Sequence, residues 1–397
     1  MRKLIFIILI VCLISSLLPL TAYAQTADWS TYSTYDYLSR FINQCGKRVA
    51  GTSGEVTASN WLRTEFASMS GLEVSVQPFD YTDEDNAKAS SSNVIAIKQS
   101  SQATDTQVII CAHYDCVMTG EGVFDNGSGV AVLLAVADSL VAQDLPFDVV
   151  FVAMGAEEAG MYGSQYYVSQ MTQADIGNTL LVINIDSVSV GDYIYVYGED
   201  VKTDYTQLFV NAGQNNDYDV TVKSKPLYKD IQLAYTGYGG YPYYQTAQLS
   251  DHSSFRSASI PTVFFFSGNY DVSLGYQVSS QSTNEVMHTS SDTLSYINEK
   301  LGISHVLKME TVVQSITKTL TSPQNATIIS TAREHMVGWF WLQTWPVCIV
   351  VALLFIVSMV IALRHLNKLR KQAILDDYEV KTDTLFKSVP PDDIYKL

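Results

Sequence analysis

Apolar runs and helix-like stretches alternate along the middle of the chain. Four of the runs are short, rich in β-branched or aromatic residues, and typical of strands buried on both faces. They are Gln107–Cys111, Asp148–Met154, Leu180–Ile185 and Thr262–Phe266. Segments of helical composition or periodicity lie between and beside them, at Glu55–Met69, Gly127–Ala142 and Lys300–Leu320. This alternation predicts an α/β fold with a mixed, largely parallel central sheet that helices cover on both faces.

A separate apolar run lies near the amino terminus. Leu4–Ile14 follows Arg2 and Lys3 and precedes the small-residue pattern Ala22-Tyr23-Ala24. A charged segment, an apolar core and a small-residue pattern, in this order, are typical of a secretory signal peptide. We therefore expect residues 1–24 to be a signal peptide, with an uncleaved N-terminal anchor as the alternative.

The segment Val337–Leu363 contains no charged residue. At about 1.5 Å of rise per helical residue, it is long enough to cross a hydrocarbon core of roughly 30 Å. Aromatic residues crowd one end and basic residues follow the other: Trp339, Phe340, Trp341 and Trp345, then Arg364, Lys368, Arg370 and Lys371. Membrane helices have aromatic residues at their interfaces and basic residues on the cytoplasmic side. The pattern predicts a transmembrane helix over 337–363, with a buried globular helix as the alternative.

This reading gives the chain four parts. The signal peptide is followed by an extracellular domain over residues 25–335, the membrane helix over 337–363 and a cytoplasmic tail over 364–397. We therefore expect a single-pass protein of the cell membrane, attached to it through the C-terminal helix.

Composition narrows the function classes. Hydrophobic residues make up 47% of the chain and charged residues 16%, which excludes wholesale disorder. Acidic residues outnumber basic ones 40 to 24, giving a net charge of −16 that repels nucleic-acid phosphates. Outside the two terminal apolar runs, Cys45, Cys111 and Cys116 are too few and too irregularly spaced for a disulfide framework or a cysteine-based zinc site.

Carboxylates and imidazoles follow the predicted strands. His113 and Asp115 come after the first strand and Asp125 before the next helix, Glu157 and Glu158 after the second strand, Asp186 after the third, and His288 and Asp292 beyond the last. In an open parallel sheet, the carboxyl ends of the strands lie at one edge, where ligands bind. Any one of these residues alone is more simply explained as a satisfied polar group or a helix cap. Carboxylates gathered in one cleft repel each other unless a cation neutralises them, and imidazoles in the set favour zinc.

A series of short motifs covers the same residues, in order. They are Arg48 with Gly51-Thr52 and Gly54, Ala112–Asp115, Gly122–Gly129, Glu157-Glu158, Asn184–Asp186, Ser250–His252, and His288-Thr289 with Asp292-Thr293. This series resembles the zinc-dependent exopeptidases that include bacterial secreted leucyl aminopeptidases and are related to glutaminyl cyclases. The resemblance extends over roughly residues 30 to 320 and implies the fold of those exopeptidases.

The resemblance also implies a role for each site residue. His113 and Asp186 would hold one zinc ion, Glu158 and His288 a second, and Asp125 would bridge the two. Glu157 would be the general base.

Other residues would support this centre. Asp115 and Asp292 follow the two histidines closely and are suited to orienting them, while Asp251 and His252 have a supporting role. The tyrosine-rich segment around Tyr241 and Tyr244 reads either as a packed surface loop or as a wall of the substrate pocket, and we expect the pocket wall. A tyrosine that assists the oxyanion in some relatives has no counterpart at 247–249, and Tyr244 is the nearest candidate.

These inferences predict a membrane-anchored di-zinc metallopeptidase that acts on peptide substrates. The acidic site suits a cationic α-amino group better than a terminal carboxylate, which favours an aminopeptidase. Two alternatives belong to other classes: an acyltransferase similar to glutaminyl cyclases, with one zinc ion, and a catalytically inactive, receptor-like ectodomain.

Overall fold

The computed structural model describes residues 29–83, 85–198, 205–226, 250–268, 270–271, 276–277 and 285–388. For residues 224–226, 270–271, 276–277, 332–352 and 377–388 it describes the backbone alone. The chain divides into two units, Met1–Ser330 and Thr331–Leu397. The predicted signal peptide, residues 1–24, lies outside the described residues and stays a prediction.

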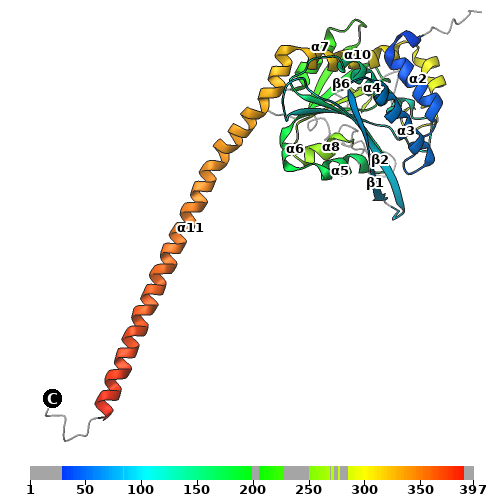
Figure 1. Cartoon of the computed structure of the whole chain (residues 1–397). Coiled ribbons are helices and arrows are strands. Elements are labelled where there is room, and N and C mark those ends of the chain that lie inside the picture. Colours follow the sequence, from blue (N-terminus) through cyan, green and yellow to red (C-terminus); the bar gives the residue numbers. More distant parts are fainter. Residues whose placement is uncertain are drawn as a thin grey trace, which may run out of the picture. The chain divides into compact units, whose positions relative to one another are not determined.

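An eight-stranded mixed sheet forms the centre of the first unit (Figure 1). Its strands are β1 (Leu72–Thr82), β2 (Lys88–Lys98), β3 (Gln107–His113), β4 (Asp148–Met154), β5 (Thr179–Ile185), β6 (Tyr193–Gly198), β7 (Thr221–Pro226) and β8 (Thr262–Gly268). Their order is β1-β2-β4-β3-β5-β8-β6-β7. The pairs β4/β3, β3/β5, β5/β8 and β6/β7 are parallel, and the pairs β1/β2, β2/β4 and β8/β6 are antiparallel. A separate short pair joins β9 (Tyr270–Asp271) to β10 (Tyr276–Gln277).

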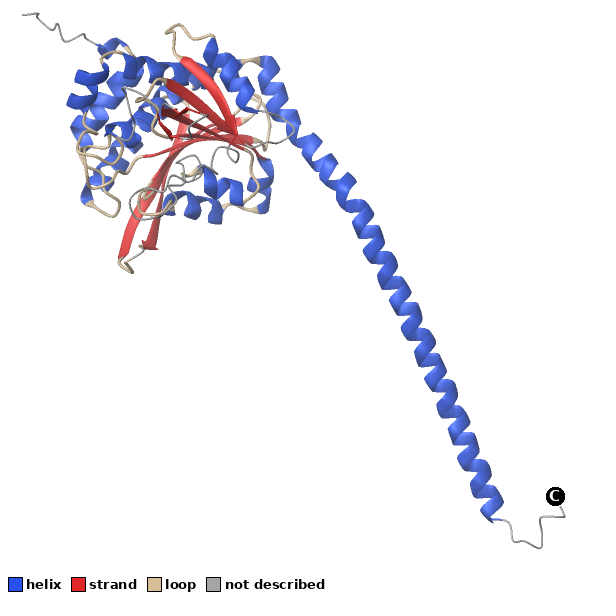
Figure 2. Ribbon diagram, turned by 180° about the vertical axis from the view of Figure 1, so that it is seen from behind, coloured by secondary structure: helices blue, strands red, loops and turns tan. Residues whose placement is uncertain are grey.

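Helices cover both faces of this sheet (Figure 2). One group packs together on one face: α2 (Ser33–Cys45), α3 (Ser53–Ser68), α4 (Ser128–Leu140), α7 (Tyr205–Gln214) and α10 (Ser304–Thr321). On the other face lie α5 (Tyr162–Gln170), α6 (Gln173–Asn178) and α8 (His252–Ser257). The remaining short helices of this unit are η1 (Trp29–Thr31), η2 (Val123–Gly127) and α9 (Leu294–Leu301). The predicted α/β fold with a mixed, mostly parallel sheet is thus confirmed.

The four strands predicted from apolar runs are β3, β4, β5 and β8, which are neighbours at the centre of the sheet. Side chains alternate between the faces of a strand, so Ile109 and Cys111 of β3 join Val150 and Val152 of β4 in one apolar cluster. Phe255 of α8 belongs to the same cluster, which packs this helix on the sheet. Burial on both faces explains why these strands are apolar throughout instead of alternating.

Helix α4 shows how apolar a core helix can be. Within the described part of the chain, Val123–Leu140 is the one helical stretch that is long and apolar enough to cross a membrane, and 89% of it is buried inside the domain. Its burial identifies it as a core helix. Cys45, Cys111 and Cys116 are likewise buried, and they are free thiols.

The helix α11 (Pro323–Ser388) includes the whole of the second unit that the structure describes. The predicted membrane span, 337–363, falls within this helix, but its side chains up to residue 352 lie outside the described residues. From Leu353 to Leu363 the large apolar side chains are exposed. The membrane span and the cytoplasmic tail stay predictions.

Candidate metal centre

The parallel pairing of β3 and β5 brings two predicted ligands together. His113 is the last residue of β3, and Asp186 directly follows β5, so both lie at the same edge of the sheet. Asp125 approaches this pair from η2, the turn before α4. The His113 Nε2 atom lies 3.3 Å from Asp186 Oδ1 and 3.2 Å from Asp125 Oδ1. One imidazole nitrogen therefore faces two carboxylates.

A second group of side chains uses the other oxygen of Asp125. The His288 Nε2 atom lies 3.0 Å from Asp125 Oδ2 and 3.2 Å from Glu158 Oε2. Glu158 belongs to the turn that follows β4, and His288 has a left-handed backbone with φ of 57°. Asp125 thus lies between two histidines and presents a different carboxylate oxygen to each.

Asp292 holds the turn that carries Asp125. Its Oδ1 atom accepts hydrogen bonds from the backbone amides of Val123 and Phe124, at 2.9 and 2.6 Å. Its Oδ2 atom accepts from the amide of Asp125 at 3.2 Å. The sequence placed Asp292 beside His288, but its hydrogen bonds in the structure fix the backbone of Asp125 instead.

Asp115 has a similar part on the opposite side. Its two carboxylate oxygens accept the backbone amides of Glu157 and Glu158, both at 3.0 Å. Its Oδ1 atom also lies 3.5 Å from Nδ1 of His113. Asp115 therefore lies beside the imidazole and shapes the turn that carries the two glutamates, and its orienting role toward His113 stays a prediction.

Burial and neighbouring charges shift the pKa values of several groups at this centre. Burial raises the pKa of Glu157 well above its ordinary value, and it raises the pKa of Glu158 to about 7. Hydrogen bonding to Asp125 and then to Glu158 raises the pKa of His288 to about 11. Burial lowers the pKa of His113, but the charges of Glu157 and Asp186 outweigh it and raise that pKa well above the usual value. The raised pKa values of the two histidines show that the surrounding carboxylates stabilise positive charge at this centre.

Donor atoms at this centre fit a metal ion. His113, Asp125 and Glu158 each offer one ligand atom, and these atoms lie within 4.8 Å of one another. Glu158 Oε1 is buried and has no hydrogen-bond partner among the described residues. Nitrogen and carboxylate donors in this combination are typical of zinc sites. The residues present therefore fit a bound zinc ion.

The Ser250–His252 motif lies at the start of α8 and contacts strand β5. The side-chain nitrogen Nδ2 of Asn184 in β5 donates to Ser250 Oγ at 2.8 Å and lies 3.3 Å from His252 Nδ1. The His252 ring stacks on Phe264 with 4.5 Å between ring centroids. Asp251 is fully buried, burial raises its pKa to about 7, and both its carboxylate oxygens lack a hydrogen-bond partner in the described structure.

Tyr241 and Tyr244 lie outside the described residues, so the substrate pocket stays a prediction.

Arg48 supports the site, a role that sequence reasoning missed although it quoted the residue within a motif. Its guanidinium is buried and lies over the ring of Phe41, 4.5 Å from the centroid. It donates to the backbone carbonyls of Gly46, Tyr114, Glu121 and Gly122. Three of these carbonyls belong to the loop between His113 and Asp125, so Arg48 joins the two ends of that loop by hydrogen bonds. Its place in the motif with Gly51-Thr52 and Gly54 is the signal that the sequence offered.

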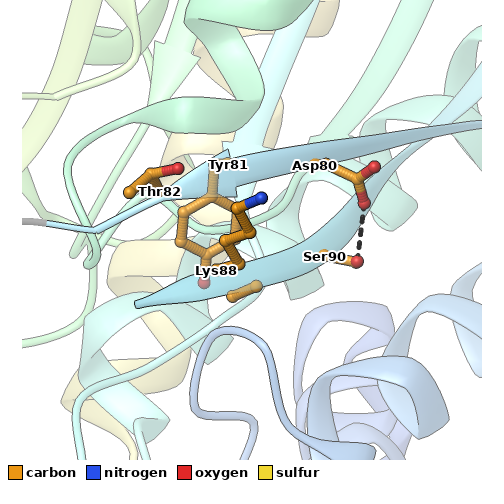
Figure 3. A pocket seen from close by; sticks show the side chains of 6 residues that line it. Asp80, Tyr81, Thr82, Lys88 and Ser90 are labelled. Carbon is orange, nitrogen blue, oxygen red and sulfur yellow. Dashed lines mark hydrogen bonds between the residues drawn. The ribbon is translucent and has the colours of Figure 1, made fainter. Parts of the chain in front are cut away.

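A hollow elsewhere in the domain does not belong to this centre. It lies on the hairpin of β1 and β2 and is lined by Asp80, Tyr81, Thr82, Lys88, Ala89 and Ser90 (Figure 3). A hydrogen bond from Ser90 to Asp80 joins two of its lining residues (Figure 3). None of these lining residues is a candidate ligand.

Comparisons with curated proteins identify relatives of this chain. It is 32% identical over 178 residues to the alkaline phosphatase isozyme conversion protein of Escherichia coli, covering 39% of this chain and 50% of the relative. It is 27% identical over 219 residues to aminopeptidase YwaD of Bacillus subtilis, covering 53% and 41%. The chain thus spans about half the length of the curated relatives it matches.

Solved structures share the fold. A zinc aminopeptidase from Bacillus subtilis, BSAP, superposes with a TM-score of 0.57 at 17% identity, over 74% of this chain and 96% of that one. Glutaminyl cyclase from Porphyromonas gingivalis gives a TM-score of 0.52 at 21% identity, over 72% and 97%.

Residues 93–310 match peptidase family M28. This stretch contains His113, Asp125, Glu157, Glu158 and Asp186, together with the later Ser250–His252 and His288 motifs. The resemblance inferred from these motifs is therefore confirmed. Because the match takes in more than half of the 397 residues, the chain belongs to peptidase family M28.

Proposed function

We propose that this protein is a di-zinc aminopeptidase, which hydrolyses the peptide bond that follows a free amino-terminal residue. The observation that carries the proposal is the position of Asp125, whose two oxygens face His113 and His288 separately. Each histidine also faces a carboxylate of its own, Asp186 or Glu158. Two donor sets that share one carboxylate support two ions more readily than one.

The two metals would supply one kind of chemistry. When bound, paired zinc ions polarise the scissile carbonyl and lower the pKa of the attacking water. His113, Asp186 and Asp125 would hold one ion, and His288, Glu158 and Asp125 the other.

Glu157 would move the protons. It occupies the same turn as Glu158, and it lies near enough to His113 and Asp186 for their charges to influence its pKa. A carboxylate with a raised pKa is suited to accept a proton from the attacking water and to deliver it to the leaving amine.

The acidic centre also indicates which end of a peptide binds. Carboxylates favour an ammonium group, and the α-amino group of a peptide is largely cationic near neutral pH. The relatives named aminopeptidase in Bacillus subtilis support the same direction of cleavage.

A glutaminyl-cyclase-like acyltransferase is a second candidate, because the Porphyromonas gingivalis enzyme has the same fold. The two candidates differ in metal content and substrate. A single tightly bound zinc ion, with cyclisation of N-terminal glutamine, would favour the cyclase. Two zinc ions, with release of the first residue from many peptides, would favour the aminopeptidase.

One peptide decides the substrate direction when it is offered with a free and with an acetylated amino terminus. The proposal expects release of the first residue from the free form and no cleavage of the acetylated form. Equal cleavage of both forms would contradict the aminopeptidase, and release of the C-terminal residue from the acetylated form would indicate a carboxypeptidase. A protein that binds zinc yet cleaves neither form would agree with the inactive, receptor-like alternative.

We also propose that the C-terminal helix anchors the protein in a membrane, with the catalytic domain outside the cell. Two features support this proposal. The large apolar side chains from Leu353 to Leu363 in α11 are exposed. Arg364, Lys368, Arg370 and Lys371 follow them, as basic residues follow a membrane span on its cytoplasmic side.

A further inference from the structure

Three successive backbone amides in the turn after β4 donate to buried carboxylates. The amides of Glu157 and Glu158 bind the two oxygens of Asp115, as described above. The amide of Ala156, one residue earlier, binds Oε1 of Glu55 at 3.0 Å. Hydrogen bonds to an ionised acceptor are stronger than those between neutral groups. Two carboxylates from different parts of the chain thus fix the turn that carries Glu157.

Glu55 lies in the first turn of α3 and is 1% exposed. Its Oε2 atom accepts the amide of Gly51 at 2.6 Å, and its Oε1 atom also accepts the hydroxyl of Ser91 in β2. Burial and the nearby charge of Asp115 raise the pKa of Glu55 to about 7, whereas its three donors favour the ionised form. One side chain therefore joins the start of α3, strand β2 and the turn after β4.

Ala156 needs this support because of its backbone conformation. Its φ is 53°, in the left-handed region, which costs a residue with a side chain roughly 1–2 kcal/mol. Its side chain is buried against Phe79 and Tyr81, and its carbonyl accepts the amide of Tyr162 at 3.0 Å. The left-handed residue reverses the chain immediately before Glu157, so a change at Ala156 would redirect the glutamate.

We propose that Glu55 is a positioning residue for Glu157, which holds the left-handed Ala156 so that the Glu157 carboxylate faces the metal centre. This inference rests on the proposed function, because Glu157 matters only if it serves as the general base. Glu55 contacts neither a proposed ligand nor the reacting atoms. It acts through the backbone of the turn.

The substitution Glu55→Gln tests this role. A glutamine amide has one acceptor oxygen, so it can serve either Ala156 or Gly51 but presents an NH₂ group to the other. Glu55→Asp is the second variant, because its shorter carboxylate keeps the charge but cannot reach both amides. Two control variants keep the bond to Ala156: Ser91→Ala removes the hydroxyl donor to the same carboxylate, and Glu310→Gln alters a carboxylate that binds Thr34 far from the turn.

Kinetics of the full chain at saturating zinc give the first measurement. We expect Glu55→Gln and Glu55→Asp to lower kcat on an aminoacyl p-nitroanilide about 10–100-fold, as loss of a supporting partner does. KM should change less than about twofold and bound zinc should stay at the wild-type level. The two controls should keep kcat within about threefold of wild type. A kcat for both Glu55 variants no lower than that of Glu310→Gln would overturn the proposal.

Hydrogen exchange of the zinc-free protein gives a second measurement that does not depend on turnover. In Glu55→Gln the Ala156 amide should exchange at least about tenfold faster than in wild type, while Ser91→Ala should leave it protected. Unchanged protection of Ala156 in both Glu55 variants would refute the positioning role even if the enzyme is an aminopeptidase. The wild-type protein could instead cleave no peptide while the Ala156 amide exchanges faster in Glu55→Gln. That result would refute the general-base function of Glu157, and with it the catalytic role of the hydrogen bond between Ala156 and Glu55.

Discussion

The carboxylate of Asp292 accepts the backbone amide of Asp125 at 3.2 Å, although 167 residues separate the two in sequence. Together with the bonds to Val123 and Phe124, it fixes the turn from which Asp125 reaches both histidines. Asp292 itself follows His288 by four residues. The last motif of the chain therefore supplies a histidine to the centre and also positions the carboxylate that this histidine faces.

Replacing Asp292 by Asn should weaken metal binding. The side chain then has one acceptor oxygen for three amides, and its NH₂ group faces at least one of the amides that it formerly bound. We expect zinc affinity to fall about 10–100-fold, the usual effect of removing a partner that orients a ligand. Competition with a fluorescent zinc chelator would measure this change. The control is Asp80→Asn on the β1–β2 hairpin, and equal affinities in the two variants would contradict the role of Asp292.

The two adjacent glutamates should respond differently to the same substitution. Glu157→Gln keeps the shape of the side chain but removes the proposed base, so kcat should fall about 10²–10⁴-fold while zinc content holds. The Glu158→Gln variant should lose zinc instead, because Glu158 Oε2 lies beside His288 Nε2 and both atoms are proposed ligands of the second ion. Elemental analysis and kinetics on the same preparations separate the two effects. Zinc loss in Glu157→Gln with retention in Glu158→Gln would exchange the two roles.

The central sheet could be predicted because burial leaves a strong pattern. Strands β3, β4, β5 and β8 are covered on both faces, so they read as continuous apolar runs. The outer strands β1 and β2 were missed because their exposed positions break that pattern. Their antiparallel pairing, together with that of β8 and β6, makes the sheet mixed.

The proximity of two candidate ligands could be predicted because parallel strands deliver their following residues to one edge. His113 and Asp186 meet for this reason. His288 was noted beyond the last predicted strand, and the motif resemblance added its expected pairing with Glu158. The contacts of Arg48 and Glu55 could not be predicted, since both side chains bind backbone groups of distant loops. Almost every residue has the same backbone amide and carbonyl, so motif spacing cannot identify which of them a side chain binds.

Stability should depend on His305 in acid. Its ring is buried against Trp29 and Tyr35, with 5.5 and 5.9 Å between ring centroids, and neither ring nitrogen has a hydrogen-bond partner in the described residues. Burial, and then the charge of Lys308, lowers the pKa of His305 from 6.5 to about 3. Below pH 6.5 the unfolded chain therefore binds a proton that the folded chain does not. The free energy of unfolding should fall as pH drops from about 6.5 towards 3, by about 1 kcal/mol per pH unit from this residue.

His305→Phe isolates this contribution, because phenylalanine fills a similar space without titrating. Urea unfolding at pH 7 and pH 5 should show a smaller loss of stability in the variant than in wild type. The two proteins are compared as differences between pH values, so a constant change in packing cancels. The same pH dependence in both proteins would show that His305 is not buried in its neutral form.

The membrane anchor can be tested in the full-length chain with two arginine substitutions. Leu354→Arg with Val357→Arg places two charges in the proposed span, and each costs roughly 2.5–3.5 kcal/mol at the centre of a membrane helix. We expect wild type to remain in the membrane pellet after alkaline carbonate extraction and this double variant to appear in the supernatant. The matched control is Leu366→Arg with Leu369→Arg, because these exposed positions lie beyond Leu363 among basic residues. Added positive charge on the cytoplasmic side of a span should not weaken its insertion. Wild type in the supernatant, or release of both double variants alike, would contradict a span that ends at Leu363.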